Sequence, residues 1–547
     1  MKLNLKKMKY NIKNTAATLL VMIMGMTSCD VNRLPETQLS DPAFWRNEND
    51  LELATNYLYT YLPSIPVTSD VWSDDAFGTS ANSISDGTRI APATDNDYNS
   101  AYSLIRAANN IIEKSPRALE NGVDPQVVDR YTAEAKFFRA WAYFRLVKRY
   151  GDVPLILTTL SENAEELYAP AAPRADVLDV VYNDLDEGAQ YLPAPSELSG
   201  GDYGRVTNTA ALAFKSRVAL FEGTRAKYHG YGDPAMHLRL AKEAAEACIN
   251  SGEHTLYGEY FDLFQYVGEG PGNKENILVK QYGVSVSESI VSHTSQRTLE
   301  TGAANPTKAL ADAYLMVDGL PMDKSPLYTN PESIMEVFQN RDPRMLDTFF
   351  KQGDEYIGTQ PVFNVPNLSF QRTGFANRRY ANLTDWQNSR SYIDYTIIRY
   401  AEVLLNFAEA TYELNGSITD DELDGSINLL RQRAGVAQLS NAFASANGLD
   451  MLAEIRRERR VELALEGFRY WDLMRWKTAE DILPQSVLGN YYYDEYGTDV
   501  TPNLTEDNII LLQAAENRSF DPDRDYLWPL PINELGLNPA LEQNPNW

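Results

Sequence analysis

The chain has 547 residues, of which 76 are acidic and 49 are basic, so its formal net charge is −27. This acidity argues against a nucleic-acid partner, which would be bound through clustered Lys and Arg side chains. It argues equally against attachment to anionic lipid through a basic surface.

The N-terminus has the features of an export signal. Five lysines precede an apolar stretch, Thr15 to Met26, that is too short to span a bilayer. Small residues then lead into Cys29, as in the lipobox of bacterial lipoproteins. We therefore predict a lipoprotein signal peptide over residues 1–28 and a mature chain, 29–547, that carries lipid on Cys29. An ordinary signal peptide with a chance cysteine is the alternative.

Helical periodicity dominates the N-terminal part of the mature chain, residues 29–256. Asp124 and Asp233 each stand before a proline, which is typical of a helix start with a capping side chain. The second cysteine, Cys248, falls on the small apolar face of a predicted helix, where a buried and inert thiol is expected. With Cys29 lipidated, no intrachain disulfide is available, so the hydrophobic core must hold the fold.

Residues 257–394 lose this periodicity and are rich in Gly, Pro, Asn, Ser and aromatic side chains, which predicts a loop-rich lobe. Loops this long usually carry function. Helical pattern returns in a C-terminal helical part and tail, residues 395–547, where Ile397, Ile398 and Ala401 belong to one apolar stripe of a predicted helix.

A charged segment from Glu454 to Arg475 contains the sequence RRERR, which in isolation resembles a nucleic-acid or partner patch. Its six arginines are interleaved with five acidic residues. Glu466 with Arg469, and Asp472 with Arg475, have the i, i+3 spacing of helical ion pairs. We therefore predict one salt-bridged structural helix here.

Five segments of the chain share a family resemblance. They are AEAKFFRAWAYFRLVKRYGDVPLI (133–156), GRVTNTAALAFKSRVALFEG (204–223), RYAEVLLNFAEA (399–410), IRRERRVELALEGFRYWDLMRW (455–476) and PLPINELGLNPALEQNPNW (529–547). In this order they resemble the SusD/RagB-type outer-membrane nutrient-binding lipoproteins, and the resemblance runs from Cys29 to Trp547.

The resemblance implies an all-α fold, with four tetratricopeptide-like helix pairs as scaffold and a loop-rich lobe that carries a shallow glycan site. Members of the family capture an oligosaccharide or polysaccharide and deliver it to a SusC-like TonB-dependent transporter. They are anchored by lipid in the outer membrane, facing the cell exterior, while separate enzymes cut the glycan. It follows that this chain is expected to have no catalytic residues and no cofactor.

Sugar binding needs aromatic faces for stacking and polar side chains that replace the hydrogen bonds of the sugar hydroxyls with water. Six of the eight tryptophans lie in helical motifs or terminal signatures, but Trp72 and Trp386 lie in polar loops. We predict that these two stack on sugar; for each, a loop anchor packed on the core is the alternative. The polar and aromatic candidates from the same loops and lobe are Asp74, Asp75, Tyr282, Arg378, Tyr380, Asn382 and Asn388.

Two other functions stay open. A glycoside hydrolase needs only two carboxylates, and Asp74 with Asp75, or Asp494 with Glu495, could be nominated. Neighbouring side chains tend to point apart, however, which does not favour a catalytic pair. A scaffold that only binds proteins is the other alternative. The four histidines show no metal-binding spacing, so no metal site is predicted. We expect the helical face to contact the transporter and the lobe to hold glycan.

Overall fold

A computed structural model of the chain describes residues 44–284, 290–497 and 500–547. The predicted signal peptide and Cys29 lie outside these residues. In the described part helices predominate, and no helix there is long and apolar enough to cross a membrane.

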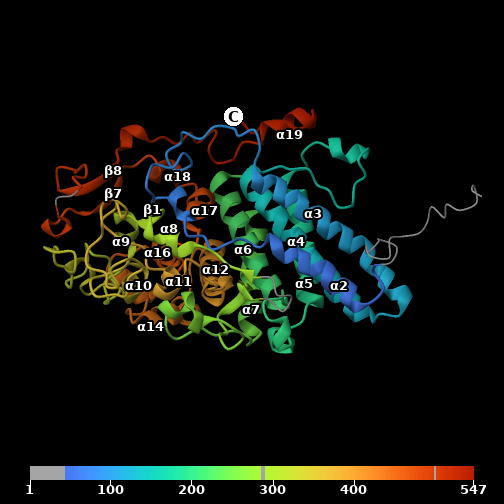
Figure 1. Cartoon of the computed structure of the whole chain (residues 1–547), viewed down its shortest axis with the longest axis horizontal. Helices are drawn as coiled ribbons and strands as arrows, with labels where there is room; N and C mark the ends of the chain where they lie inside the picture. Colours follow the sequence, from blue (N-terminus) through green and yellow to red (C-terminus); the bar gives the residue numbers. More distant parts are fainter. Residues whose placement is uncertain (1–43, 285–289, 498–499) are drawn as a thin grey trace, which may run out of the picture.

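The longer helices form one continuous array. From α3 onward, each packs against the next in the order α3, α4, α5, α6, α7, α12 and α16 (Figure 1). Their bounds, with those of α2 and α17, are α2 (Glu48–Asn56), α3 (Asn96–Lys114), α4 (Pro125–Tyr150), α5 (Arg174–Tyr191), α6 (Asn208–His229), α7 (Pro234–Asn250), α12 (Tyr400–Asn415), α16 (Met451–Glu462) and α17 (Arg469–Arg475). The mainly helical, tetratricopeptide-like fold predicted from the sequence is confirmed.

Local signals in the sequence set the ends of these helices. Asp124 caps α4 by accepting a hydrogen bond from the backbone N–H of Gln126, and Asp233 caps α7 in the same way. Close packing between α6 and α7 depends on Gly223, because a Cβ there would come within 2.8 Å of the Leu238 side chain. Cys248 is buried as expected, and burial raises the pKa of its thiol to about 12.

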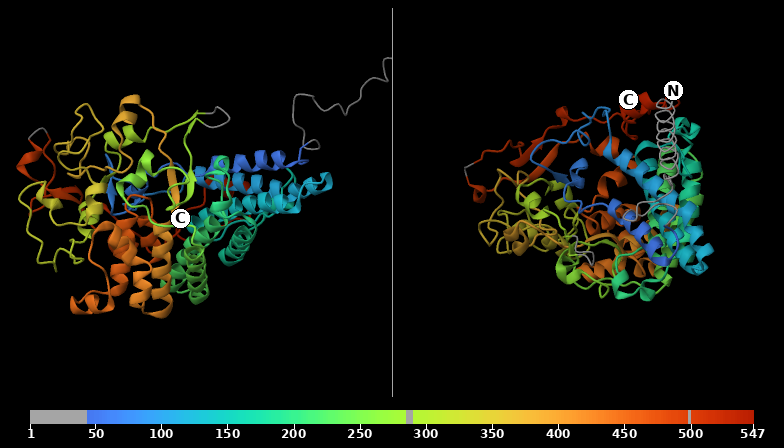
Figure 2. Two further views of the ribbon diagram at one scale, coloured as in Figure 1. Left: turned by 90° about the horizontal axis from the view of Figure 1, so that it is seen from below. Right: turned by 45° about the vertical axis from the view of Figure 1, so that its right-hand side comes forward.

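Short elements make up the rest. Between residues 257 and 394 no described helix exceeds six residues, and this loop-rich segment lies on the opposite side of the molecule from α2 to α5 (Figure 2). The short helices are α8 (Ser295–Glu300), α9 (Lys308–Ala313), α10 (Pro343–Thr348), α11 (Leu383–Asn388), α13 (Asp420–Asp424), α14 (Ile427–Ala434), α15 (Asn441–Ala446), α18 (Ala479–Ile482) and α19 (Ile532–Leu537).

Every strand in the described residues belongs to a two-stranded antiparallel sheet. The pairs are β1 (Ala76–Phe77) with β5 (Asn305–Pro306), β2 (Asn276–Lys280) with β6 (Tyr395–Arg399), β3 (Gly283–Val284) with β4 (Ile290–Val291), and β7 (Val487–Tyr491) with β8 (Ile509–Gln513). Strand β6 corrects one prediction: Ile397 and Ile398 were expected in the helix that follows, but they belong to a buried strand, where β-branched side chains pack well.

The predicted helix from Glu454 to Arg475 is also corrected, because it is two helices, α16 and α17. The chain turns between them at Leu465 and Gly467, which both have positive φ. Asp472 and Arg475 form the expected ion pair at 2.8 Å, whereas Glu466 and Arg469 do not pair with each other. The turn separates them, and each finds a partner elsewhere in the chain.

Buried ion pairs join α16 to the loop-rich lobe. Arg399, at the end of β6, pairs with Glu275 at 2.9 Å and with Glu466 at 2.8 Å, and Arg344 of α10 pairs with Glu458 at 2.7 Å. All five side chains are almost completely buried. The charged segment is therefore structural, as predicted, but it binds the lobe as well as its own helix.

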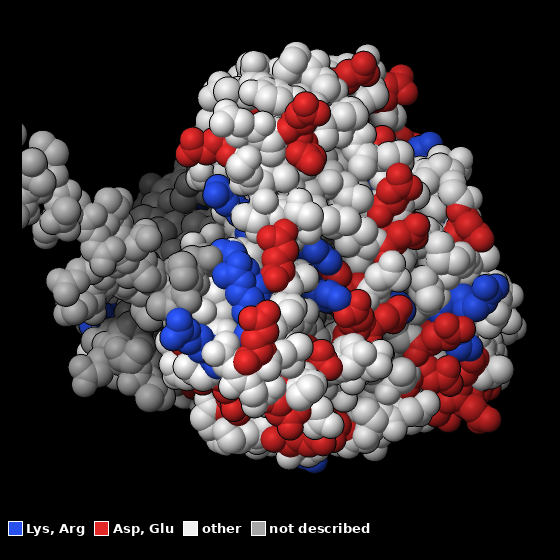
Figure 3. Space-filling model, turned by 90° about the vertical axis from the view of Figure 1, so that its right-hand side faces the viewer, with Lys and Arg blue, Asp and Glu red and all other residues white. Residues whose placement is uncertain are grey.

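The surface reflects the excess of acidic residues. On the face at the end where α2 to α5 lie, Asp and Glu side chains are spread widely and basic side chains lie among them (Figure 3).

Candidate ligand-binding site

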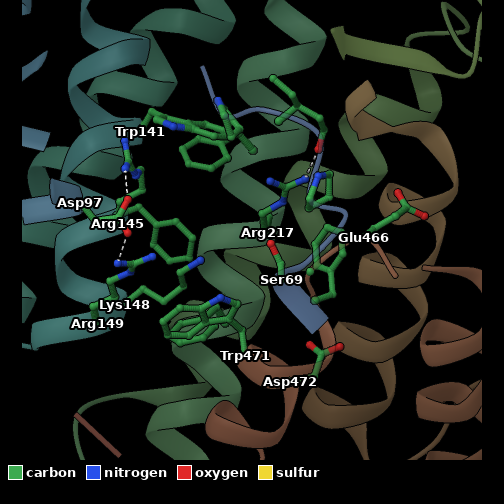
Figure 4. Close-up of a pocket in the computed structure, with 18 of the residues that line it drawn as sticks. Ser69, Asp97, Trp141, Arg145, Lys148, Arg149, Arg217, Glu466, Trp471 and Asp472 are labelled. Carbon is green, nitrogen blue, oxygen red and sulfur yellow. Dashed lines mark hydrogen bonds and ion pairs between the residues drawn. The ribbon is translucent and has the colours of Figure 1, made fainter. Parts of the chain in front are cut away.

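A cavity of about 550 Å³ lies where an N-terminal segment crosses the helical array. The crossing segment includes the short 3-10 helix Ser69–Trp72, and the other walls come from α3, α4, α6, α16, α17 and β6 (Figure 4). None of the residues that line it comes from the loop-rich segment 257–394. The sequence predicted a site in the loop-rich lobe, whereas this cavity lies in the helical parts of the chain.

Aromatic side chains form much of the wall. Trp141 of α4 stacks on Phe214 of α6 with ring centroids 4.6 Å apart. On the opposite side Trp72 meets the ring of Tyr470 edge-on at 5.9 Å, and Trp471 completes this wall. Trp72 and Trp471 both line the cavity and are only partly buried.

Charged side chains alternate with these rings, and basic residues outnumber acidic ones. Six basic side chains and three acidic ones line the cavity, in a chain that is acidic as a whole. They are Arg145, Lys148, Arg149, Arg217, Arg459, Arg475, Asp97, Glu466 and Asp472.

Most of these charges are paired. Arg217 binds both carboxylate oxygens of Glu402, at 2.6 and 2.5 Å. Arg145 and Arg149 share the single carboxylate of Asp97 (Figure 4), which Arg145 meets at 2.6 Å. Lys148 forms no ion pair with any residue that the structure describes; its ammonium lies 4.2 Å from the ring centroid of Trp471.

The pKa shifts follow from burial and from this excess of positive charge. Burial lowers the pKa of Lys148, and the nearby Arg149, Arg217 and Arg145 lower it further, to well below its usual value. Burial raises the pKa of Asp97, but Arg149 and Arg145 outweigh burial, and the pKa is held below its usual value. Asp97 is therefore a fixed anion, and it does not neutralise all the basic groups around it.

Trp72 is the one predicted site residue that lines the cavity. Its neighbours Asp74 and Asp75 point instead at arginines of α16 and α17. Asp74 accepts hydrogen bonds from Arg469 at 2.8 Å and from Arg460 at 2.9 Å, and the buried Asp75 accepts one from Arg460 at 2.8 Å. These ion pairs fasten the segment that carries Trp72 to the two helices.

The polar candidates of the lobe mostly bond within the protein. Arg378 lies over the ring of Phe261, 4.0 Å from its centroid, and donates a hydrogen bond to the carbonyl oxygen of Leu346. Tyr380 is buried and has positive φ. Asn382 caps α11. The structure does not bring these three to the cavity.

The remaining candidates also lie outside the cavity. Trp386 is half-buried in α11, packs against a small hydrophobic cluster, and has the Arg297 guanidinium 4.5 Å from its ring centroid. Asn388, at the end of α11, is exposed. Tyr282 contacts the ring of His293 edge-on at 4.7 Å. Trp386 and Asn388 thus mark a second polar and aromatic surface, separate from the cavity.

Sequence reasoning missed Trp141, Lys148 and Trp471, because all three lie in segments that read as ordinary amphipathic helix. A usable signal was present on α4, where Trp141, Arg145 and Lys148 recur at the i, i+4 and i, i+3 spacings of one helical face. Aromatic and basic side chains together on a face that is otherwise buried indicate a lined cavity rather than a simple core.

The arrangement gives no support to hydrolysis. The cavity acids are engaged by arginines: Asp472, for example, pairs with Arg459 at 3.0 Å and with Arg475 at 2.8 Å. Glu495, nominated with Asp494, accepts a hydrogen bond from the backbone N–H of Ile334 and does not line the cavity. Among the described residues, no group of three or more His, Cys, Asp or Glu is placed to hold a metal ion.

Comparison with known proteins finds relatives that are similar over nearly the whole chain. The chain is similar to SusD-like protein P2 of Formosa agariphila (26% identical, covering 97% of this chain and 99% of that protein) and to a SusD-like protein of Bacteroides ovatus (25% identical, 97% and 96%). A solved SusD-like carbohydrate binding protein of Bacteroides fragilis is 26% identical with a TM-score of 0.75, over 91% of this chain and all of that one.

Two family models match separate parts of the chain. The model described as "Starch-binding associating with outer membrane" matches residues 49–220, and the model of the SusD family matches residues 293–547. Neither description names a catalytic activity. The first match contains α3, α4 and most of α6, and the second contains α12, α16 and α17, so the helices that enclose the cavity are the matched segments. The chain belongs to the SusD family.

Proposed function

We propose that this protein captures an oligosaccharide or polysaccharide in the aromatic cavity and delivers it to a SusC-like TonB-dependent transporter. The observation that carries the proposal is the cavity itself, which is lined by the partly buried Trp72 and Trp471 beside charged groups. Its volume of about 550 Å³ lies within the range of small-ligand sites. The similar protein of Bacteroides fragilis is described as carbohydrate binding, which supports the assignment.

The chemistry of the walls suits capture rather than cleavage. The C–H face of a sugar ring is apolar and stacks on indole, while charged side chains exchange hydrogen bonds with its hydroxyls. Glycoside hydrolysis would need one carboxyl group with a raised pKa opposite a second, ionised one. Asp97 does not meet this need as the acid, because its pKa is lowered.

The location follows from the family and from the N-terminus. The description "Starch-binding associating with outer membrane" supports placement at the outer membrane. We infer that lipid on Cys29 provides the anchor and that the protein faces the cell exterior, where a glycan is met before the transporter. Copurification from solubilised outer membranes tests the partner: a TonB-dependent barrel should be recovered with the tagged protein and absent from a mock purification.

Glycan binding is tested with the mature chain, without lipid, against a panel of polysaccharides, with released sugars assayed in the same samples. Binding without release is expected. Two variants of matched type locate the site: Trp72→Ala/Trp471→Ala removes two cavity rings, and Trp386→Ala removes the half-buried ring of the lobe. We expect the double variant to lose at least about tenfold in affinity, since each stacked ring contributes on the order of 1 kcal/mol or more, and the lobe variant to bind normally.

The opposite pattern, with loss only in Trp386→Ala, would place the glycan on the loop-rich lobe. Release of shorter sugars by the wild-type protein would replace capture with hydrolysis. Thermal unfolding of each variant shows whether a loss of binding is a loss of fold.

A further inference from the structure

The basic residues of the cavity are not evenly balanced by acids. Arg217 is matched by Glu402. Arg459 and Arg475 share Asp472 and Glu409, which gives two positive and two negative charges. Each of these groups is close to neutral, so none of them has a charge to offer a ligand.

The α4 edge of the cavity is different. Arg145, Lys148 and Arg149 stand on neighbouring turns of one helical face, and Asp97 is the only carboxylate that the structure pairs with them. Three positive charges therefore face one negative charge. An excess of positive charge that is partly removed from water is unfavourable unless an anion joins it.

Lys148 is the centre of this excess. Its side chain runs from α4 into the cavity (Figure 4), with the ammonium 4.2 Å from the centroid of Trp471 and 5.6 Å from that of Phe144. Cation–π contact of this kind stabilises an ammonium but leaves its charge unneutralised. The ammonium is thus available to a group on a ligand that also touches Trp471.

We propose that the cavity takes a glycan whose sugars carry an anionic group, either a carboxylate or a sulfate, and that Lys148 binds that group. This inference rests on the proposed function, because it assumes that a sugar occupies the cavity. A neutral sugar would satisfy the rings but would leave the excess charge of the α4 edge uncompensated.

The direction of the Lys148 pKa agrees with this assignment. Burial and three neighbouring arginines lower that pKa, and an anion at the ammonium would act in the opposite sense. The net charge of the chain gives the proposal a sharp test. A protein of net charge −27, with acidic side chains spread over the face seen in Figure 3, repels polyanions in general, so retention of an acidic polymer requires a local basic site.

The test uses pairs of glycans that differ only in charge. Polygalacturonate is compared with its methyl ester, and a sulfated galactan with its desulfated form, by calorimetry and by electrophoresis in gels that contain the polymer. The first pair tests whether the site recognises a carboxylate, and the second pair tests whether it recognises a sulfate. A neutral starch-type glucan completes the panel.

Three variants accompany the wild-type protein. Lys148→Met removes the charge and keeps the length, Lys148→Arg keeps the charge, and Lys136→Met makes the same charge change on α4 outside the cavity, where Lys136 pairs with Glu187. We expect one acidic polymer to bind more tightly than its neutral partner. Lys148→Met should weaken that binding by at least about tenfold, the effect of one charged hydrogen bond, while the other two variants stay close to wild type.

Equal binding of a charged polymer and its neutral partner would overturn the inference, as would equal affinities of Lys148→Met and Lys136→Met for the charged polymer. If a neutral polymer binds and the binding is lost in Trp72→Ala/Trp471→Ala, glycan capture stands and only the acidic specificity fails. If no polymer of any class binds, the proposed function itself fails. Lys148→Arg shows whether the loss in Lys148→Met comes from the missing charge or from misfolding, since the arginine variant should retain both stability and binding.

Discussion

A buried carboxyl group helps to hold the segment that forms the outer wall of the cavity. Asp70 lies in the 3-10 helix that ends at Trp72, is 3% exposed, and accepts a hydrogen bond from the backbone N–H of Gly467 at 2.8 Å. Burial, with Asp75 nearby, raises the pKa of Asp70 from its ordinary value of 3.8 to about 8. The folded protein therefore holds a proton on Asp70 at pH values where the unfolded chain has lost it.

This shift predicts a pH-dependent stability. Between roughly pH 4 and pH 8 the folded state binds more protons than the unfolded state, so the Asp70 contribution to the free energy of unfolding falls as the pH rises. Asp70→Asn removes that dependence and keeps an acceptor for Gly467. Its melting temperature relative to wild type should therefore increase from about pH 5 to about pH 9, measured by thermal unfolding, with the exposed Asp494→Asn as control. A difference that does not change with pH would contradict the assignment.

At the residue scale the sequence predicted only part of the site. Trp72 could be found because an indole in a polar loop is unusual, whereas Trp471 and Lys148 lie on helices, where aromatic and basic residues have an ordinary explanation. Asp74 and Asp75 were expected to meet a ligand, but their arginine partners lie nearly 400 positions later in the chain. Sequence spacing contains no information about such a long-range ion pair.

At the scale of elements, the helices follow local signals and the exceptions follow tertiary packing. Capping residues and proline positions fix where α4 and α7 begin. Residues 395–399 instead form β6, because β2 supplies a pairing edge that lies far away in the sequence. The break between α16 and α17 is likewise invisible to helical periodicity, although Gly467 supplies the positive φ that the turn requires.

The buried ion pairs that α16 makes with α10 of the lobe, with β6 and with α14 predict a large effect of one substitution. Glu462 is fully buried and binds Arg344, Arg399 and Arg433, which outweigh burial and hold its pKa well below the usual value. Glu462→Gln leaves these arginines with less than full compensation, and we expect the free energy of unfolding to fall by about 3–5 kcal/mol. Equilibrium unfolding in urea measures this change in the free energy of unfolding.

Glu243→Gln makes the same chemical change at an exposed position of α7 and should shift stability by about 0.5 kcal/mol or less. If Glu462→Gln is no less stable than this control, the buried pairs do not hold the lobe to the helices.

For the whole molecule, the family motifs predicted the helical scaffold well because they are the helices that pack on one another. They could not predict where the cavity lies, since its wall forms only when residues 60–72 cross helices that come much later in the chain. The loop-rich lobe contributes no lining residue, despite a composition that suggested a binding surface. Composition identifies a loop, whereas enclosure depends on which elements the fold brings together.

The acidity of the molecule and the predicted lipobox together predict that attachment to a membrane depends on one residue, Cys29. A chain of net charge −27 gains nothing from anionic lipid, so the acyl chains expected on Cys29 are the attachment that the sequence predicts. We therefore predict that a version secreted by a cleavable signal and starting at Asp30 appears in the soluble fraction and takes up no labelled fatty acid. Cys248→Ala, which alters the buried thiol instead, should stay in the outer-membrane fraction and keep the label. Membrane retention of the version that lacks Cys29 would show a second attachment, and the transporter would then be the first candidate, because its copurification would persist without lipid.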